Sequence, residues 1–203
     1  KKAFKAREGY GLFAIVQGST YKNLRNISAK ELTNMMFDGY AIGGLAVGEG
    51  HQNMVTMVEH TVPLLPEDKP HYLMGVGKPI DIISAVYHGI DMFDCVIPTR
   101  SGRNAQAFVR SGTINVKNAQ YKTDKTALDS KCLCYCCRNY SRAYLNHLFK
   151  VKEILGPMLL TLHNLHYYQD LMKEIRYHIK NKSLSDYYQE QTSLHNQRNK
   201  INS

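Results

Sequence analysis

The chain of 203 residues contains no apolar run near the ~18 to 20 residues that a membrane span requires, so no membrane association is expected. It also has no short apolar segment of the kind that directs export, which argues against a framework of disulfide bonds. An initiator Met is missing as well, because the chain opens on Lys1-Lys-Ala-Phe-Lys5. From these absences we expect a cytoplasmic protein, and we expect the chain to be a fragment of a longer one.

Acidic residues are few relative to basic ones. The chain has 17 Asp and Glu against 26 Lys and Arg, which gives a net charge of +9 and a pI near 9.3. Such an excess indicates an anionic partner, and nucleic acid is the commonest one for a basic protein. A generically basic chain from an A/T-rich genome has the same composition, because Lys, Asn, Ile and Tyr are all plentiful. Charge alone leaves both interpretations open.

Short apolar runs recur along the first half of the chain, and each is followed by a glycine-rich or polar turn and then a helical pattern. The turns begin near Gln17, Gly44, Met74 and Asp94, at intervals of 27, 30 and 20 residues. This spacing fits a strand, a helix and two short loops, so we expect consecutive βα units and a parallel sheet. The runs do not alternate in polarity, as is typical of strands buried on both faces.

The remaining pattern predicts helices and one hairpin. Ser28 and Glu31 have capping-box spacing, which predicts a helix that opens there and ends near Phe37. The tail from about Asn181 is polar, and we expect it to fray. The other expected elements are helices over 52–65, 79–88, 141–155 and 157–180, and a hairpin of strands 106–110 and 113–116.

The ends of parallel strands are where functional groups of such folds gather. A glutamine at Gln17, beside the exposed backbone of the turn around Gly44, suits a flat heterocycle such as a purine. Met74 can form an apolar floor under such a ring. Asp94 can act as a nucleophile at an acetal-like carbon. The competing interpretations are a loop hydrogen-bonder at Gln17, a core residue at Met74 and a helix cap or turn residue at Asp94.

The glycine-rich segments do not support a nucleotide cofactor. Residues 43–50 do not match the dinucleotide fingerprint, and Pro79 stands where a phosphate-binding loop needs Ser or Thr after Lys78. Arg100 and Arg103 follow Asp94 closely, where a loop would meet the phosphates that flank a reacting nucleotide. The alternative is a solvated basic loop.

Four of the five cysteines fall within six residues, at Cys132, Cys134, Cys136 and Cys137. Thiolates this close in a reducing compartment most often hold a metal, and zinc needs about four soft ligands. The run offers C-x-C-x-x-C and one spare thiol. A fourth ligand would come from downstream, where three histidines follow. These are His147, His163 and His166. The alternative is a cluster of free thiols in a buried turn.

These motifs together resemble the tRNA-guanine transglycosylase (queuine tRNA-ribosyltransferase) family, from about residue 8 to 180 and in colinear order. The resemblance implies the C-terminal part of a TIM (β/α)8 barrel, an α/β fold, with a zinc-binding subdomain and C-terminal helices. It divides the chain into barrel units over 1–110, a zinc-binding subdomain and helices over 111–180, and a polar tail over 181–203. The matching segments are 15–19, 42–49, 72–79, 93–104 and the cysteine run.

The resemblance also implies an activity and its residues. Asp94 corresponds to the nucleophile that attacks C1′ of the wobble guanosine of tRNA, forms a covalent intermediate and is then replaced by a 7-deazaguanine base. Val47 resembles the bacterial branch, whose base is 7-aminomethyl-7-deazaguanine (preQ1). The remaining implied positions are Gln17, Gly44, Leu45 and Met74 for the base, Arg100 and Arg103 for tRNA, and Cys132, Cys134, Cys137 and His163 for Zn2+, with Cys136 and His147 as bystanders.

The resemblance covers only the family's C-terminal half. The aspartate that acts as general base and a second aspartate that reads the base edge belong to the other half, so we expect no competent enzyme from this chain alone. The complete bacterial-type protein is expected to be a homodimer near the zinc subdomain. A non-catalytic zinc-containing tRNA-binding partner subunit is the alternative, but such a partner should lack Asp94 or the Gly43-Gly44-Leu45 turn. A TIM-barrel enzyme that does not act on RNA is disfavoured by the basic loop and the net charge.

Overall fold

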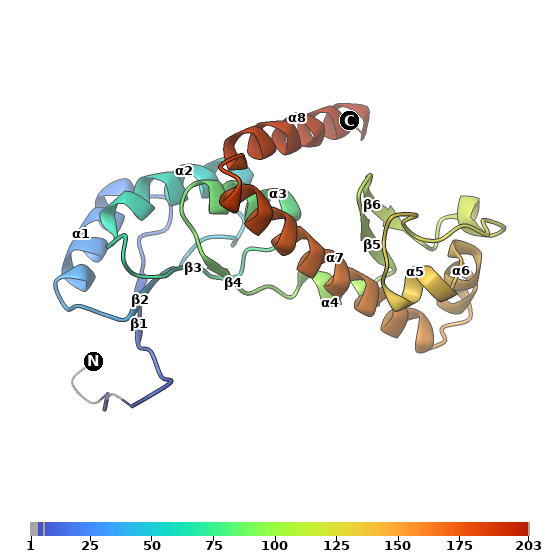
Figure 1. The fold of residues 1–203 in the computed structure, drawn as a ribbon, viewed down its shortest axis with the longest axis horizontal. Helices are drawn as coiled ribbons and strands as arrows, with labels where there is room; N and C mark the ends of the chain where they lie inside the picture. Colours follow the sequence, from blue (N-terminus) through green and yellow to red (C-terminus); the bar gives the residue numbers. More distant parts are fainter. Residues whose placement is uncertain (1–3, 6, 203) are drawn as a thin grey trace. The chain divides into compact units, whose positions relative to one another are not determined.

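The structure is a computed structural model that describes residues 4–5 and 7–202, without the side chains of residues 199, 201 and 202. The chain forms two compact units (Figure 1). The first contains the residues up to Cys95 together with Ser185–Thr192, and the second contains Val96–Leu184 and the residues from Ser193 onward. The three-part division at residues 110 and 180 stays a prediction.

The first unit is built on a four-stranded parallel sheet in the order β1-β2-β3-β4. In register, Val16 pairs with Ile42, Ile42 with Leu73, and Leu73 with Phe93, so the carboxyl ends of all four strands lie at one edge. This confirms the predicted parallel sheet. The strands are β1 (Phe13–Val16), β2 (Gly39–Ile42), β3 (His71–Leu73) and β4 (Met92–Phe93).

A helix follows each of the first three strands, as the βα spacing predicts. Apolar side chains from strands and helices, among them Val16, Ile42 and Val58, are fully buried between them. Each such burial stabilises the fold by about 1.5–3 kcal/mol. The helices are α1 (Lys22–Thr33), α2 (His51–Thr61), the short 3-10 turn η1 (Val62–Leu64) and α3 (Pro79–Tyr87).

The predicted start of the first helix was wrong. The helix α1 begins at Lys22, six residues before Ser28, so the capping-box spacing lies inside the helix. The Ser28 hydroxyl instead accepts a hydrogen bond from the backbone N–H of Gln17 at 3.1 Å. A residue that resembles a cap by spacing therefore fixes the loop that follows β1.

The second unit packs a β-hairpin and short helices against one long helix. Gly102 makes this packing close, because a Cβ built there would lie 2.7 Å from the Cα of Thr161. The predicted hairpin is confirmed. Two helices follow the cysteines as predicted, but the first ends at Lys150 and not near 155. The elements are α4 (Ile97–Arg103), β5 (Gln106–Val109), β6 (Gly112–Asn115), η2 (Ala119–Tyr121), α5 (Tyr135–Asn139), α6 (Arg142–Lys150) and α7 (Leu155–Lys180).

The polar tail is helical, which corrects the expectation that it frays: α8 spans Leu184–Asn202. Tertiary contacts account for the difference. Tyr187 is only 4% exposed, and the ring of Tyr188 stacks on that of Tyr87 with centroids 4.3 Å apart. Farther along, the guanidinium of Arg198 donates to the carbonyl of Arg110 at 3.0 Å. Among the described residues, no helix is long and apolar enough to cross a membrane.

Candidate active site and metal centre

Five of the predicted site residues follow the carboxyl ends of four adjacent strands. Gln17 follows β1, Gly44 and Leu45 follow β2, Met74 follows β3 and Asp94 follows β4. Because the strands are parallel and in register, these positions share one edge of the sheet. The structure therefore brings together residues that are up to 77 positions apart in the sequence.

The Asp94 carboxylate is exposed and held by two donors. The Tyr72 hydroxyl donates to its Oδ1 at 2.6 Å, and the backbone N–H of Gly75 donates to the same oxygen at 2.9 Å. The hydrogen bond from Tyr72, followed by that from Gly75, lowers the pKa of Asp94. The carboxylate is therefore ionised, and it is held in place through its Oδ1. This arrangement suits a nucleophile or a group that stabilises positive charge.

The Gln17 side chain lies across the glycine turn that follows β2. A Cβ built on Gly43 would lie 2.6 Å from Gln17 Nε2, and one built on Gly44 would lie 2.8 Å from Gln17 Oε1. A Cβ at either position would displace the amide, and Gly44 also has a φ of 67°, which favours glycine. The turn is closed by Glu49, whose carboxylate accepts hydrogen bonds from the backbone N–H groups of Ala46 and Val47.

The other predicted base-site residues differ in exposure. The Leu45 side chain is only 4% exposed and belongs to the core, so a ligand at the sheet edge would meet its backbone. Met74 is half-buried, as a floor under a ring would be. Val47 is 80% exposed at the outer side of the turn.

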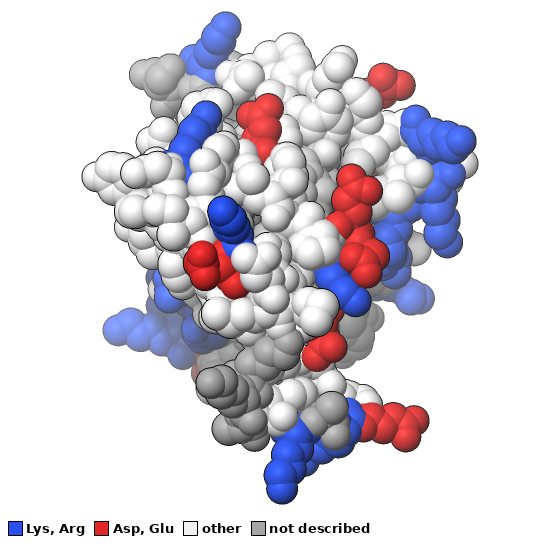
Figure 2. Space-filling view, turned by 90° about the vertical axis from the view of Figure 1, so that its left-hand side faces the viewer, with Lys and Arg blue, Asp and Glu red and all other residues white. Residues whose placement is uncertain are grey.

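Arg100 and Arg103 were predicted in a loop, but both lie on the helix α4 in the second unit, and both are exposed. Neither appears in an ion pair of the described residues. The face drawn in Figure 2 is largely uncharged, with Lys and Arg side chains scattered among Asp and Glu. The chain has a net charge of +9, but the Lys and Arg side chains on that face do not gather into one basic patch.

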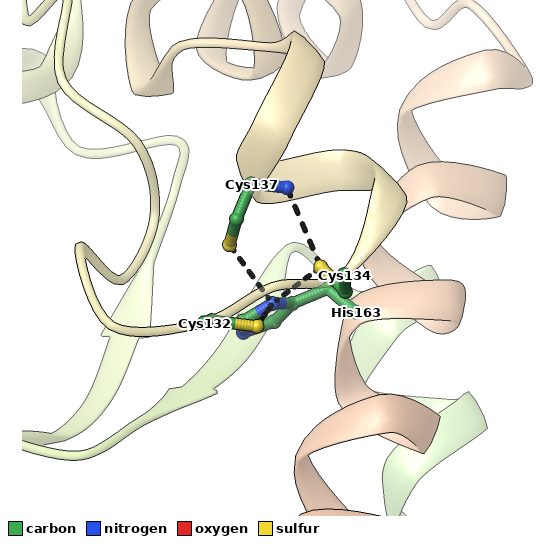
Figure 3. Close-up of side chains that lie close together, drawn as sticks. All are labelled: Cys132, Cys134, Cys137 and His163. Atoms are coloured by element: carbon green, nitrogen blue, oxygen red, sulfur yellow. Dashed lines mark hydrogen bonds between the residues drawn. The ribbon is translucent and has the colours of Figure 1, made fainter.

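Three cysteines and one histidine converge in the second unit (Figure 3). The donor atoms of Cys132, Cys134, Cys137 and His163 all lie within 4.8 Å of one another. The three sulfurs lie 3.7, 3.5 and 3.4 Å from His163 Nδ1. Tetrahedral zinc with Zn–S and Zn–N bonds of about 2.3 and about 2.1 Å separates such S and N atoms by about 3.6 Å. The four residues therefore fit Zn2+.

The neighbours of the zinc ligands fix which histidine nitrogen faces the sulfurs. His163 is fully buried, and its Nε2 donates to the backbone carbonyl of Phe108 at 2.7 Å. This bond leaves Nδ1 deprotonated and free to bind the metal. The next residue, Asn164, accepts from the backbone N–H of Phe108 at 3.0 Å. Two consecutive side chains of α7 thus bind both backbone groups of one residue on β5.

The remaining candidates for the metal lie apart from it. Cys136 is fully buried, and burial raises the pKa of its thiol to about 12, so it is a neutral thiol. His147 is exposed on α6. His166 pairs with Asp170 one turn away at 3.1 Å. Among the described residues, one group of side chains is placed to hold a metal ion, and it consists of Cys132, Cys134, Cys137 and His163.

Sequence reasoning missed several residues that hold these sites. Tyr72 could have been found from the sequence. It is the middle residue of a short strand whose other two residues are buried, and its aromatic ring carries a polar hydroxyl. The sequence signal for Glu49 is weaker: it is an acidic residue three positions after Ala46, whose backbone N–H it accepts from. Asn164 has only its place beside His163. Arg25, which is fully buried beneath the turns after β1 and β2, gave no signal in the sequence.

The four-stranded parallel sheet with exposed polar groups at its carboxyl edge is built as the βα units of a TIM barrel are, and the same chain carries a Cys3His zinc unit. A family model described as queuine tRNA-ribosyltransferase matches residues 1–197. The chain belongs to the queuine tRNA-ribosyltransferase family, and the Cys3His cluster is its zinc site.

Individual relatives agree with the family match. Proteins named queuine tRNA-ribosyltransferase from Rickettsia africae, Rickettsia conorii and Rickettsia typhi are each 59% identical to this chain over 180 residues. The match covers 89% of this chain and 50% of each relative. The chain thus spans about half the length of the curated relatives it matches.

Proposed function

We propose that this chain is the nucleophile-bearing, zinc-binding part of a tRNA-guanine transglycosylase. Its activity would exchange the wobble guanine of a tRNA anticodon for a 7-deazaguanine base, as a step of queuosine biosynthesis. The observation that carries this proposal is the Asp94 carboxylate, exposed at the sheet edge and ionised by its hydrogen bonds to Tyr72 and Gly75. The name shared by its relatives supports the same activity.

In the proposed reaction Asp94 is the nucleophile. Tyr72 and Gly75 hold Oδ1, so Oδ2 would attack C1′ of the ribose. A C–O bond forms, the C1′–N9 bond breaks, and guanine leaves with the electron pair and takes up a proton. N9 of the incoming base, having lost its proton, then attacks C1′ and releases the carboxylate. Two displacements at one carbon give net retention.

The base would lie between the Gln17 amide, the Gly44 and Leu45 backbone, and Met74. We propose preQ1 as that base, because Val47 makes this turn resemble that of the bacterial branch. Competition between preQ1 and queuine for incorporation, in a protein that contains this chain and the rest of the barrel, tests the choice. Preferential incorporation of queuine would contradict it.

Zinc has a structural role in this proposal. Bound by Cys132, Cys134, Cys137 and His163, it would join the cysteine loop to α7 and supply folding free energy. Arg100 and Arg103 on α4 would contact the phosphates of tRNA. No step of the reaction passes through the metal.

The complete protein is proposed to be a homodimer that associates near the zinc unit. A hollow of about 870 Å³ lies there, lined in part by Tyr140 and Tyr144, whose rings stack with centroids 5.3 Å apart. Tyr144 and Tyr135 are exposed beside it. Tyr144→Asp should convert the dimer to monomer in analytical ultracentrifugation, whereas Tyr177→Asp, at an exposed position near the end of α7, should not.

Asp94→Asn in a protein with the complete barrel is the decisive experiment. The substitution keeps size and most hydrogen bonding but removes the anionic nucleophile. Base exchange should fall by several orders of magnitude with tRNA affinity little changed, and the covalent adduct on denaturing gels should vanish. A persistent adduct would place the nucleophile elsewhere. Full tRNA binding without an adduct in the wild type would favour a non-catalytic partner subunit.

We further propose that exchange requires residues beyond these 203, because the general base implied by the family lies in the other half. The chain expressed alone should bind zinc but show neither exchange nor adduct. Robust exchange by the chain alone would overturn this part of the proposal.

A further inference from the structure

Arg25 is a fully buried cation that the proposed chemistry does not use. It lies in the first turn of α1, where the helix dipole disfavours positive charge. Burial lowers the pKa of its guanidinium, and the negative charge of Glu49 acts in the opposite direction. One of its buried nitrogens, Nη1, makes no hydrogen bond. An apolar side chain could fill this space without such costs, so packing alone does not explain an arginine here.

The guanidinium binds the two loops that carry the candidate base-recognition residues. Its Nε donates to the carbonyl of Ser19 at 2.7 Å, in the loop that starts with Gln17. Its Nη2 donates to the carbonyl of Gly43 at 3.1 Å, at the start of the turn after β2. Gly18 makes room for the side chain, because a Cβ built there would lie 2.9 Å from Arg25 Cγ.

The bond to Gly43 also sets the direction of the next N–H group. A trans peptide is planar, and its C=O and N–H point to opposite sides. Arg25 holds the carbonyl of Gly43 on the buried side, so the N–H of Gly44 faces the exposed side. The Gln17 amide lies on the same turn, 2.8 Å from where a Cβ of Gly44 would be.

We propose that Arg25 is a positioning residue for base recognition. By holding the carbonyls of Ser19 and Gly43, it orients the Gly44 N–H and the Gln17 amide together toward a purine-like ligand. The inference rests on the proposed base site. It adds a residue that never touches the ligand but determines how well the ligand is bound.

Arg25→Lys tests the inference, because lysine keeps the charge but lacks the planar fork that reaches two carbonyls. The probe is preQ1, titrated into a protein that contains this chain and the rest of the barrel, and followed by the amide signals of Gly44 and Gln17 in 15N–1H NMR. In the variant the Gly44 signal should move or broaden, and preQ1 affinity should fall about tenfold or more. Zinc content and far-UV circular dichroism should not change. Lys22→Met, an exposed position one turn earlier on α1, should leave both NMR readouts as in the wild type.

Unchanged Gly44 signals and unchanged preQ1 affinity in Arg25→Lys would overturn the inference while leaving the base site intact. No binding of preQ1 by the wild type would overturn the base site and the inference together. If Arg25→Lys does not fold, the wild type provides the test. Addition of preQ1 should shift the Arg25 Nε–H signal, because the carbonyls that Arg25 binds belong to the loops of the base site. An unshifted signal would overturn the inference.

Discussion

The two units hold their functional groups by different means. In the first, exposed groups at the ends of successive strands are oriented by nearby hydrogen bonds, as Tyr72 and Gly75 orient Asp94. In the second, a largely buried cluster joins three cysteines to a histidine 26 to 31 residues farther along the chain, and each sulfur lies within 3.7 Å of one nitrogen of that histidine. Regular backbone pairing builds the first site, whereas side chains and a metal build the second.

The two units should therefore respond differently to substitution. A substitution at a strand-end site should remove function without unfolding the unit, because the sheet beneath the site remains intact. A metal site should lose structure, because the metal is part of the folding free energy. The following predictions test this contrast, beginning with the largest expected effect.

His163→Ala should abolish zinc binding and unfold the cysteine loop with the adjacent part of α7, a loss of several kcal/mol or more. Chelation of the metal should do the same to the wild type. Elemental analysis and urea unfolding measure both effects. His147→Ala, an exposed histidine on α6, is the control and should keep one zinc per chain. A His163→Ala variant with full zinc occupancy and stability would break the comparison.

Asn164→Ala should destabilise the second unit by about 3 kcal/mol, because it leaves buried backbone groups without partners. The amide donates to the carbonyls of Pro98 and Gln106, both at 2.9 Å, and accepts from the N–H of Phe108. Denaturant unfolding of the zinc-loaded chain measures the loss. Asn139→Ala, an exposed asparagine on α5, should cost far less. Equal stabilities for the two variants would mean that the metal alone holds this unit together.

Replacing Arg100 and Arg103 with Ala should weaken tRNA binding and flatten its salt dependence by about two units of slope, one for each phosphate contact. Affinity measured over a range of salt concentrations, in a protein with the complete barrel, gives the slope. The exposed pair Lys152 and Lys182 provides a charge-matched control. An unchanged slope would remove the arginines from the tRNA interface.

Tyr72→Phe should raise the pKa of Asp94 toward its ordinary value, because the largest cause of its lowering is lost. A carboxylate with a raised pKa is protonated at higher pH, so the acidic limb of base exchange should move to higher pH. Titration followed by 13C NMR of the Asp94 carboxyl measures the pKa directly. Tyr21→Phe, an exposed tyrosine distant in sequence, should leave it in place. A fixed pKa in Tyr72→Phe would show that Gly75 alone orients the carboxylate.

Local pattern was sufficient for most of the fold. The parallel strands, the hairpin and the helices after the cysteines follow from apolar runs and turn residues whose spacing is visible along the chain. Two of the errors have clear physical causes. Ser28 has the spacing of a cap but serves the loop of Gln17, and the polar tail becomes α8 because Tyr187 and Tyr188 pack on distant partners.

Residue types and their spacing are enough to identify the available chemistry: a thiolate run for zinc, and a carboxylate, an amide and a glycine turn at regular strand-plus-helix intervals. Tertiary packing, in contrast, determines which of these groups meet. It selected His163 over His147 and His166 by placing Nδ1 against three sulfurs, and it placed Arg25 beneath two loops. Both choices depend on distances between elements far apart in the chain. Such distances are set by packing, which local patterns do not encode.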